Sequence, residues 1–501
     1  MPERATHRVR WSEESAEAVV AEGELEAKGR TWRKVKRALV SDVAMPQKSR
    51  QLELPFESWG EASAHKGSVE ATLATRGSGH LGSADLMEQV VSRPNLQAAL
   101  KRVRKNKGSP GIDGMTVGAL PAFLIAHWTR IREELLTGMY RPAAIKRVEI
   151  PKSGGGVREL GIPTVLDRFI QQALLQVLQP EFDPSFSTHS YGFRPGRSAH
   201  AAVKAARAYV QSGRRYVVDM DLEKFFDRVN HDVLMSRLAR RIGDRRVLGL
   251  IRRYLGAGVM AQGVLMDRYE GTPQGGPLSP LLANALLDEV DKELERRGHA
   301  FVRYADDCNV YVRSRRAGER VMALLRRLVT RLHLRVNETK SAVDLARNRK
   351  ILGYTFWYTL GGTVTKLKVA DKALETLKER VRRITRRTGG RSMEQVVAEL
   401  RDYLPGWRAY FSLSEAQGVF GNLDKWIRHR LRAIHLRQWR RGKTVFRELR
   451  RRDACVQLAA NVAKNTRRWW KNSAMDLNVV LPVRYFDQLG VPRLRSVTST
   501  P

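Results

Sequence analysis

Two adjacent carboxylates, Asp306 and Asp307, lie between two short apolar segments and are the residues most suited to metal chemistry. The flanking segments 301–304 and 308–312 are rich in aromatic and β-branched residues, which predicts two strands joined by a turn. Like charges this close repel, and partial burial adds to the cost of ionising both. Magnesium would offset that cost, because hard cations prefer carboxylate oxygens. Asp-Asp is also a common turn sequence, so a metal site requires a third acid.

The third acid is Asp221, which follows a segment of alternating polarity. The alternation over 216–222 predicts a strand with Val218 and Met220 on one face and Asp219 and Asp221 on the other. One acid from a strand end and two from a hairpin turn make the set that two-metal phosphoryl transfer requires, with the ions about 3.5–4 Å apart. One ion activates a hydroxyl nucleophile and the other stabilises the leaving oxygen. We therefore predict nucleotide addition with two Mg²⁺ ions as cofactors.

Seven ordered blocks of sequence resemble those of the bacterial group II intron reverse transcriptases and maturases, most closely their class C branch. The resemblance runs from about Ser83 nearly to the C-terminus, and the order and spacing of the blocks are more specific than any single block. Two blocks are the Asp221 strand and the Tyr304 hairpin. The others are 108–114, the discontinuous set within 150–163, 191–198, 272–280 and 336–340.

The resemblance implies an α+β fold with the right-hand polymerase architecture, in which fingers, a palm with an antiparallel sheet and an α-helical thumb surround the nucleic acid. Ser279 and Pro280 predict a helix that starts with Ser279 as N-cap. Five segments follow from composition and the resemblance. They are a weakly ordered N-terminal extension (1–82), fingers with the family's N-terminal extension motif (83–215), the catalytic palm (216–365), the thumb and maturase region (366–450) and a small DNA-binding segment (451–501).

Residue roles carry over from the family at matching positions. The resemblance implies that Asp221, Asp306 and Asp307 are catalytic and bind the metals together with Leu222, which also contacts the nucleotide. It implies that Lys340 donates a proton to the leaving pyrophosphate, a general-acid role, although a surface lysine is the simpler alternative.

The incoming dNTP has a predicted set of contacts of its own. The resemblance implies that Lys152 and Arg158 hold the triphosphate, since arginine suits bidentate phosphate contact. Gln274 and Gly275 belong to a glycine-containing loop. The glycines let the backbone approach the nucleotide closely, or they only shape the loop, and the two roles are compatible.

The resemblance also implies an aromatic ring that excludes a ribose 2′-OH. Phe226, five residues after Asp221, matches that position, while its neighbour Phe225 is nearly as well explained as a core residue.

Composition indicates a polyanionic partner. The chain has 90 Lys+Arg against 52 Asp+Glu, a formal net charge of +38. The excess is uneven, because 428–453 contains eleven Lys/Arg and two Asp/Glu, whereas 1–44 is nearly balanced. We predict contacts with intron RNA, the DNA target and the primer. The predicted contact residues are Arg194, Arg437, Arg440, Arg441 and Arg447.

Several classes of protein are excluded. No apolar run approaches the 18 or so residues of a membrane span, and the N-terminus has no segment typical of a signal peptide, so we expect no membrane partner and a cytoplasmic, at times nucleoid-associated, location. Two cysteines without a C-x-x-C pair exclude a disulfide framework. We also expect no endonuclease domain, and hence a primer taken from a nick, a replication fork or single-stranded DNA.

These observations predict an RNA-directed DNA polymerase that is also an intron maturase. It would bind group II intron RNA, assist splicing and copy the intron into DNA during retrohoming. Two alternatives stay open at this point: a domesticated relative in defence or repair, and a splicing maturase whose polymerase is idle. The intact acid set argues against an idle polymerase.

Overall fold

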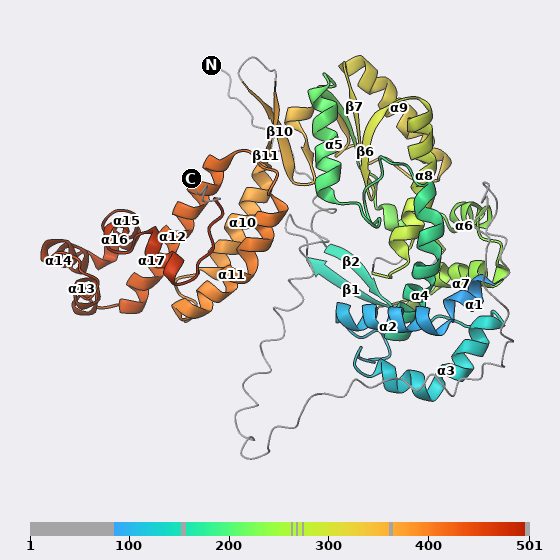
Figure 1. The fold of residues 1–501 in the computed structure, drawn as a ribbon, viewed down its shortest axis with the longest axis horizontal. Coiled ribbons are helices and arrows are strands. Elements are labelled where there is room, and N and C mark those ends of the chain that lie inside the picture. The colour runs from blue at the N-terminus through green and yellow to red at the C-terminus, as the bar shows by residue number, and fades with distance from the viewer. Residues whose placement is uncertain are drawn as a thin grey trace, which may run out of the picture. The chain divides into compact units, whose positions relative to one another are not determined.

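The computed structural model describes residues 85–151, 157–261, 264–266, 269–272, 275–359 and 364–495 of the chain (Figure 1). The predicted N-terminal extension, 1–82, lies outside these residues. The described chain is a mixed α+β protein with two compact units. The first comprises 85–202 with 216–344, and the second comprises 203–215 with 345–495.

The first unit contains a four-stranded sheet in the order β6-β7-β3-β8, of which Figure 1 labels β6 and β7. The predicted metal ligands Asp221, Asp306 and Asp307 lie at the ends of its strands. β7 is antiparallel to both neighbours: Tyr304 pairs with Asp307 in the β6 hairpin, and Met220 pairs with Cys308 across β3. The predicted hairpin is therefore confirmed. The strands are β3 (Tyr216–Met220), β6 (Ala300–Tyr304), β7 (Asp307–Val312) and β8 (Ala342–Leu345).

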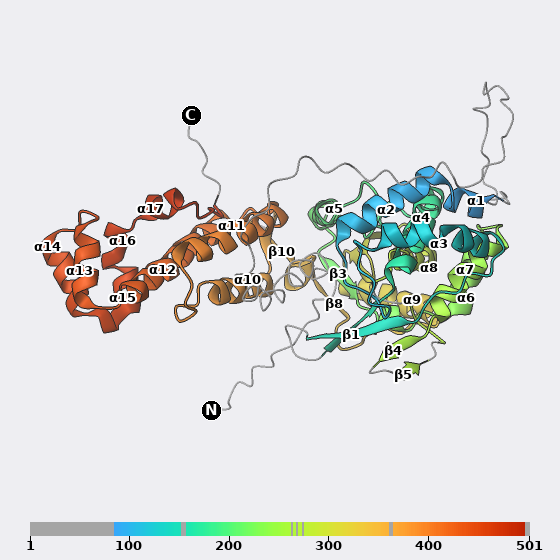
Figure 2. The same ribbon diagram turned by 90° about the horizontal axis from the view of Figure 1, so that it is seen from below.

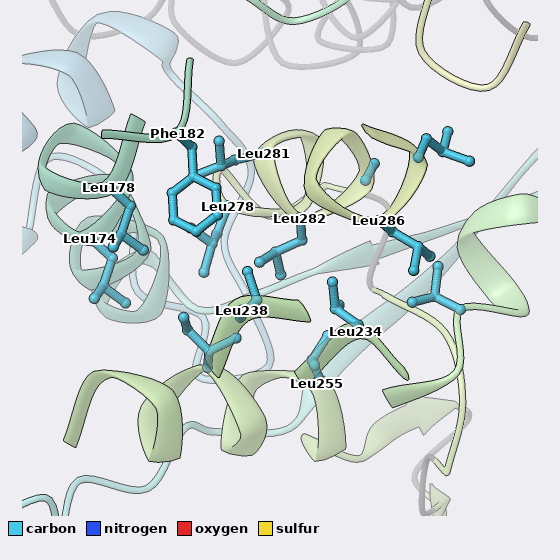
Figure 3. Packing of buried hydrophobic residues seen from close by; sticks show 14 of the residues in the cluster. Leu174, Leu178, Phe182, Leu234, Leu238, Leu255, Leu278, Leu281, Leu282 and Leu286 are labelled. Carbon is cyan, nitrogen blue, oxygen red and sulfur yellow. The ribbon is translucent and has the colours of Figure 1, made fainter. Parts of the chain in front are cut away.

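The apolar face of this sheet packs into the main hydrophobic core. Val218, Met220 and Leu222 are all buried in that cluster, as the alternating pattern predicts. Figure 3 shows part of the same core, where leucines of the α8 region meet those of α4, α6 and α7. These helices are α4 (Val165–Phe182), α6 (His231–Ala239), α7 (Arg245–Gly256) and α8 (Ser279–Arg296). Because α8 begins at Ser279, the N-cap is Leu278, one residue before the predicted cap.

A second four-stranded sheet, in the order β2-β1-β4-β5, completes the first unit (Figure 2). β1 is antiparallel to β2 and parallel to β4. The strands are β1 (Ile145–Pro151), β2 (Val157–Ile162), β4 (Val259–Ala261) and β5 (Val264–Met266). The remaining helices of this part of the chain are α1 (Leu86–Val90), α2 (Arg93–Asn106), α3 (Leu120–Leu136), the start of α5 (Ala199–Gln211) and α9 (Arg315–Arg331).

The second unit joins a small sheet to a set of helices. Its strands pair in the order β11-β10-β9, and β9 and β10 fall within the predicted palm segment but cluster with this unit. One reason is that β11 is tied to α5, whose Gln211 side chain accepts a hydrogen bond from the amide of Thr365 at 2.6 Å. The division into five segments stays a prediction. The strands are β9 (Lys350–Ile351), β10 (Tyr354–Tyr358) and β11 (Thr365–Val369).

Helices make up most of the rest of the second unit. None of the helices in the described ranges is both long enough and apolar enough to span a bilayer. They are α10 (Asp371–Ile384), α11 (Met393–Tyr410), α12 (Gln417–Trp439), α13 (Gly442–Arg450), α14 (Val456–Lys464), α15 (Trp469–Ala474), α16 (Asp476–Val480) and α17 (Val483–Gln488).

Candidate active site

The β6–β7 turn places two carboxylates at one end of the main sheet. Tyr304 and Asp307 close a turn of only two residues, Ala305 and Asp306. Ala305 has φ +58°, a left-handed conformation that is uncommon for a residue with a Cβ. Asp306 and Asp307 are half-buried, so their charges are held at the edge of the sheet.

Asp221 reaches the same end of the sheet from β3. Since Met220 pairs with Cys308, the next residue of β3 comes beside Asp307. The backbone of Asp221 is fixed on both sides: its amide donates to Ser341 Oγ at 3.0 Å, and its carbonyl accepts from the Asn337 amide at 2.8 Å. The sequence-predicted acids are thus brought together from β3 and from the β6–β7 turn.

Lys340 lies beside this acidic group. Its Nζ is 3.6 Å from Asp221 Oδ2, and the two side chains are 26% and 12% exposed respectively. The contact puts Lys340 within the candidate site, while its role as a proton donor stays a prediction.

Asp221, Asp306 and Asp307 offer the type of ligand that magnesium prefers, because all three side chains have carboxylate oxygens. Within the described ranges, however, no group of three His, Cys, Asp or Glu side chains is arranged so that it could hold a metal ion. The binding of two Mg²⁺ ions by these residues therefore stays a prediction.

Leu222 contributes to such a site only through its backbone. Its side chain is 2% exposed and belongs to the main core. Leu222 forms a bridge with Val336, and the two hydrogen bonds around it use the Asp221 carbonyl and the Glu223 amide. Neither of these bonds uses the Leu222 carbonyl, the one atom of this residue suited to bind a metal.

The two phenylalanines after Asp221 have different surroundings. Phe225 is 2% exposed and lies within the core, whereas Phe226 is half-buried and packs against the edge of that core. Their rings make an edge contact, with centroids 5.1 Å apart. The backbone carbonyl of Phe226 accepts from the Thr272 amide at 2.6 Å, which ties it to the loop that leads to Gly275. This difference in burial supports Phe226 as the ring that meets the sugar.

Replacing Phe226 by Ala is expected to relax the discrimination between dNTPs and rNTPs by about tenfold or more, because the ring that excludes the 2′-OH is lost. Single-nucleotide incorporation with matched dNTP and rNTP pairs measures this. Phe225→Ala is the control. It should destabilise the fold by about 3–5 kcal/mol without changing sugar selectivity. Relaxed selectivity in Phe225→Ala alone would show that the other ring meets the sugar.

The predicted triphosphate and nucleotide contacts are described in part. Lys152 and Gln274 lie outside the described residues. Arg158 is on β2, where its backbone pairs with Ile150. Gly275 has φ +134°, and a Cβ there would lie 2.6 Å from the carbonyl oxygen of Gly161. A glycine is needed here for the loop to approach β2, which explains this position structurally and leaves the nucleotide contact a prediction.

The structure contradicts the prediction that Arg194 contacts nucleic acid. Its side chain is 4% exposed. Nε donates to Asp183 Oδ1 at 2.7 Å, and Nη1 donates to the carbonyls of Ser187 and Ser190 at 2.5 and 3.0 Å. The third nitrogen, Nη2, donates to the Asp183 carbonyl at 2.8 Å. Arg194 therefore stabilises its own loop, and its guanidinium has no surface to offer a phosphate.

A buried arginine that the sequence pattern does not single out supports the β6–β7 turn, which carries Asp306. Arg303 on β6 is 1% exposed and binds Asp291 of α8 through Nε and Nη2, at 2.8 and 2.6 Å. Its Nη1 donates to the Ala305 carbonyl at 2.8 Å and to Asn284 Oδ1 at 2.9 Å. Arg303 thus stabilises the strained turn through the carbonyl of Ala305. An arginine inside an apolar strand was the available signal, hidden among the 90 Lys and Arg residues.

The arginine-rich segment 428–453 is divided between interior and surface. Arg428 and Arg432 are 0% and 4% exposed, and Arg428 Nη2 binds Asp487 Oδ1 at 2.9 Å. These two therefore hold the helices of the second unit together. The four arginines predicted to bind nucleic acid in this segment are exposed. They are Arg437, Arg440, Arg441 and Arg447.

Two protein families match the chain. The family described as reverse transcriptase (RNA-dependent DNA polymerase) matches residues 150–356, which include Asp221, Asp306 and Asp307. The group II intron maturase-specific domain matches residues 374–453, which include the exposed arginines of the second unit.

Individual relatives match about two fifths of the chain. Protein YkfC of Escherichia coli (strain K12) is 38% identical over 216 residues, which are 42% of this chain and 57% of YkfC. The group II intron-encoded protein LtrA of Lactococcus lactis subsp. cremoris is 36% identical over 202 residues, which are 40% of this chain and 33% of LtrA. The chain thus spans only part of each relative's length. A chain of the solved "Partial Cas6-RT-Cas1--Cas2 complex" is 26% identical, with a TM-score of 0.33, and covers 46% of this chain and 38% of that one.

Proposed function

We propose that this chain, which belongs to the group II intron-type reverse transcriptases and carries their maturase-specific domain, binds group II intron RNA, assists its splicing and copies it into DNA during retrohoming. One observation carries the proposal. Asp221 and the Asp306-Asp307 turn lie at one end of an antiparallel sheet, inside the reverse transcriptase match. The maturase-specific match in the same chain supports the splicing role.

The architecture proposed with this function is the right-hand polymerase. The segments 83–215 and 216–365 would form fingers and palm, and the β6-β7-β3 sheet supports this because it presents the acids at one end. The helices within 366–450 would form the thumb and maturase region, and those after 451 a small DNA-binding segment.

The catalytic residues have separate tasks in the proposed reaction. Asp221 and Asp306, assisted by Asp307, would bind two Mg²⁺ ions together with the backbone of Leu222. When bound, such ions supply activation of the primer hydroxyl and stabilisation of the leaving oxygen. Lys340, already beside Asp221, would protonate the pyrophosphate as it leaves.

The nucleotide is held by other residues. Lys152 and Arg158 would bind the triphosphate, and Gln274 and Gly275 would line the nucleotide from the loop that contacts β2. Phe226 would close the sugar pocket.

Two assays test the proposal on the purified chain. Primer extension on an RNA template with dNTPs and Mg²⁺ should give cDNA, and addition of EDTA should stop it. Splicing of a group II intron RNA, at a Mg²⁺ concentration just too low for self-splicing, should depend on the protein. Extension without splicing would restrict the function to polymerisation, and splicing without extension would leave a maturase with an idle polymerase.

Neutralising the four exposed arginines is expected to weaken RNA binding in a salt-dependent way. With Arg437, Arg440, Arg441 and Arg447 changed to Gln, the slope of log affinity against log salt should fall by up to roughly 0.9 per lost duplex phosphate contact, and by less for single strands. The fold should persist, because exposed charges contribute little to stability. Filter binding at several salt concentrations measures the slope.

The matched control removes the same charge from the other unit. Arg315, Arg316, Arg320 and Arg327 on α9 are all exposed, and their change to Gln should leave the slope for intron RNA nearly unaltered. Single-nucleotide addition on a saturating primer–template should survive in both variants. Equal effects from both sets would mean that bulk charge, and not the maturase segment, binds the RNA.

A further inference from the structure

Phe193 combines an exposed aromatic ring with a strained backbone, directly beside the catalytic turn. The residue is 42% exposed and has φ +57°, a conformation that is a genuine outlier for a bulky side chain. Its ring centroid is 6.4 Å from that of Tyr304, two residues before Asp306. Backbone strain of this kind persists where the surroundings impose it, and it gathers at functional sites.

The residues before Phe193 are fixed to the catalytic hairpin. The Tyr191 amide donates to the Arg303 carbonyl at 2.9 Å, and Asn284 Nδ2 donates to the Gly192 carbonyl at 3.0 Å. Gly192 packs so closely that a Cβ on it would overlap the amide nitrogen of Ala305. The backbone entering Phe193 therefore has no freedom to relax independently of the turn.

The residue after Phe193 is fixed as firmly. Arg194 is the buried arginine whose guanidinium donates to Asp183, Ser187 and Ser190. With both neighbours held, the left-handed conformation of Phe193 and the outward direction of its ring are imposed together.

Packing does not account for this arrangement. A phenylalanine that is 42% exposed gains less from burial than one in the core, and the strained backbone costs stability. The surroundings instead suit a nucleic acid strand. The guanidinium of Arg197 lies 5.7 Å from the ring centroid of the buried Tyr191, so the loop that carries the exposed ring of Phe193 also carries a half-buried cation. Surfaces that combine an aromatic ring with a cation bind nucleic acid strands by base stacking.

We propose that Phe193 stacks on a base of the bound primer–template beside the catalytic turn, an inference that rests on the proposed polymerase function. The strained loop would hold the ring in the stacking position before the substrate arrives. Its ligand is a base within a strand, so the ring would position nucleic acid and would not select the incoming dNTP.

Two variants distinguish the contribution of the Phe193 ring to binding from the effect of its strained backbone. Phe193→Gly removes the ring and permits φ +57° without cost, whereas Phe193→Tyr keeps both the ring and the strain. We expect Phe193→Gly to weaken primer–template binding between about fivefold and about 100-fold, the range for losing one stacked base. Its Tm should be unchanged or higher, and Phe193→Tyr should bind within about twofold of the parent chain. Ile125→Ala on α3, where Ile125 is 48% exposed, is the control for losing a surface apolar group and should change nothing.

Filter binding of a primer–template without dNTP, a dNTP titration at saturating primer–template, and thermal unfolding are measured on all four chains. Unchanged primer–template affinity in Phe193→Gly would overturn the proposal. So would a raised KM for dNTP alone, or a large fall in Tm, which would indicate a packing role. A parent chain that binds but does not extend primers would refute the proposed polymerase function, and binding by Phe193→Gly would still decide whether the ring contacts the strand.

Discussion

Asp306→Ala and Asp221→Ala are each expected to lower DNA synthesis at least about 10³-fold while intron RNA binding stays close to that of the parent chain. The reason is that each substitution removes a carboxylate needed to bind the ions at the end of the sheet. RNA binding should survive, because Arg437, Arg440, Arg441 and Arg447 belong to the other unit.

Primer extension and filter binding on the same preparations measure the two activities. Asp232→Ala is a suitable control, since the Asp232 side chain is 82% exposed on α6 and pairs with Arg252 at the surface. It should be fully active. Retained synthesis in either Asp306→Ala or Asp221→Ala would refute the assignment of the acids. Loss of synthesis together with loss of RNA binding would point to misfolding.

Arg303→Met is expected to destabilise the chain by about 3–5 kcal/mol, because it leaves the Asp291 carboxylate buried without its counter-ion. Asp291 is 0% exposed, and burial already raises the pKa of this carboxyl despite the opposing effect of Arg303. Urea unfolding measures the loss. DNA synthesis should also fall, because Arg303 no longer donates to the Ala305 carbonyl under the catalytic turn.

The stability lost in Arg303→Met should depend on pH, because the pKa of Asp291 is raised in the folded chain. Without Arg303, the pKa of Asp291 in the folded chain rises further above its unfolded value, so folding favours the protonated acid. The stability deficit should therefore be smallest at low pH and grow as pH rises through that raised pKa.

A double variant distinguishes charge from packing. Arg303→Met with Asp291→Leu removes both charges and should recover most of the lost stability, because apolar groups of similar volume can replace a buried ion pair. It should not recover synthesis, since the bond to Ala305 is still absent. A single Arg303→Met variant as stable as the parent chain would show that the buried pair is unimportant. Full synthesis in the double variant would show that the turn needs no such support.

The sequence determined the parts of this protein that depend on local pattern. The strands on either side of Asp306 follow from aromatic and β-branched residues, and the structure confirms the hairpin. Asp221 could be placed with Asp306 and Asp307 because a strand end and a hairpin turn lie at one edge when their strands pair in register. The apolar face of β3 was predictable from period-two alternation.

Only the tertiary structure decided what individual arginines and phenylalanines do. Arg194, Arg303 and Arg428 look like any of the 90 Lys and Arg residues in the sequence, yet all three are buried. Each arginine pairs with an acid on another element of the fold, such as Asp291 for Arg303 and Asp487 for Arg428. A local sequence pattern does not predict such pairs.

Local sequence also does not predict which of the phenylalanines are buried. Phe225 and Phe226 are adjacent in sequence, and they differ in burial because the core encloses Phe225 and only borders Phe226. In the sequence, the charge of Arg194 indicates a contact with nucleic acid, whereas a phenylalanine such as Phe193 is typical of a core. In the folded chain, hydrogen bonds within its own loop occupy the guanidinium of Arg194, and the fixed backbone between Gly192 and Arg194 leaves Phe193 exposed.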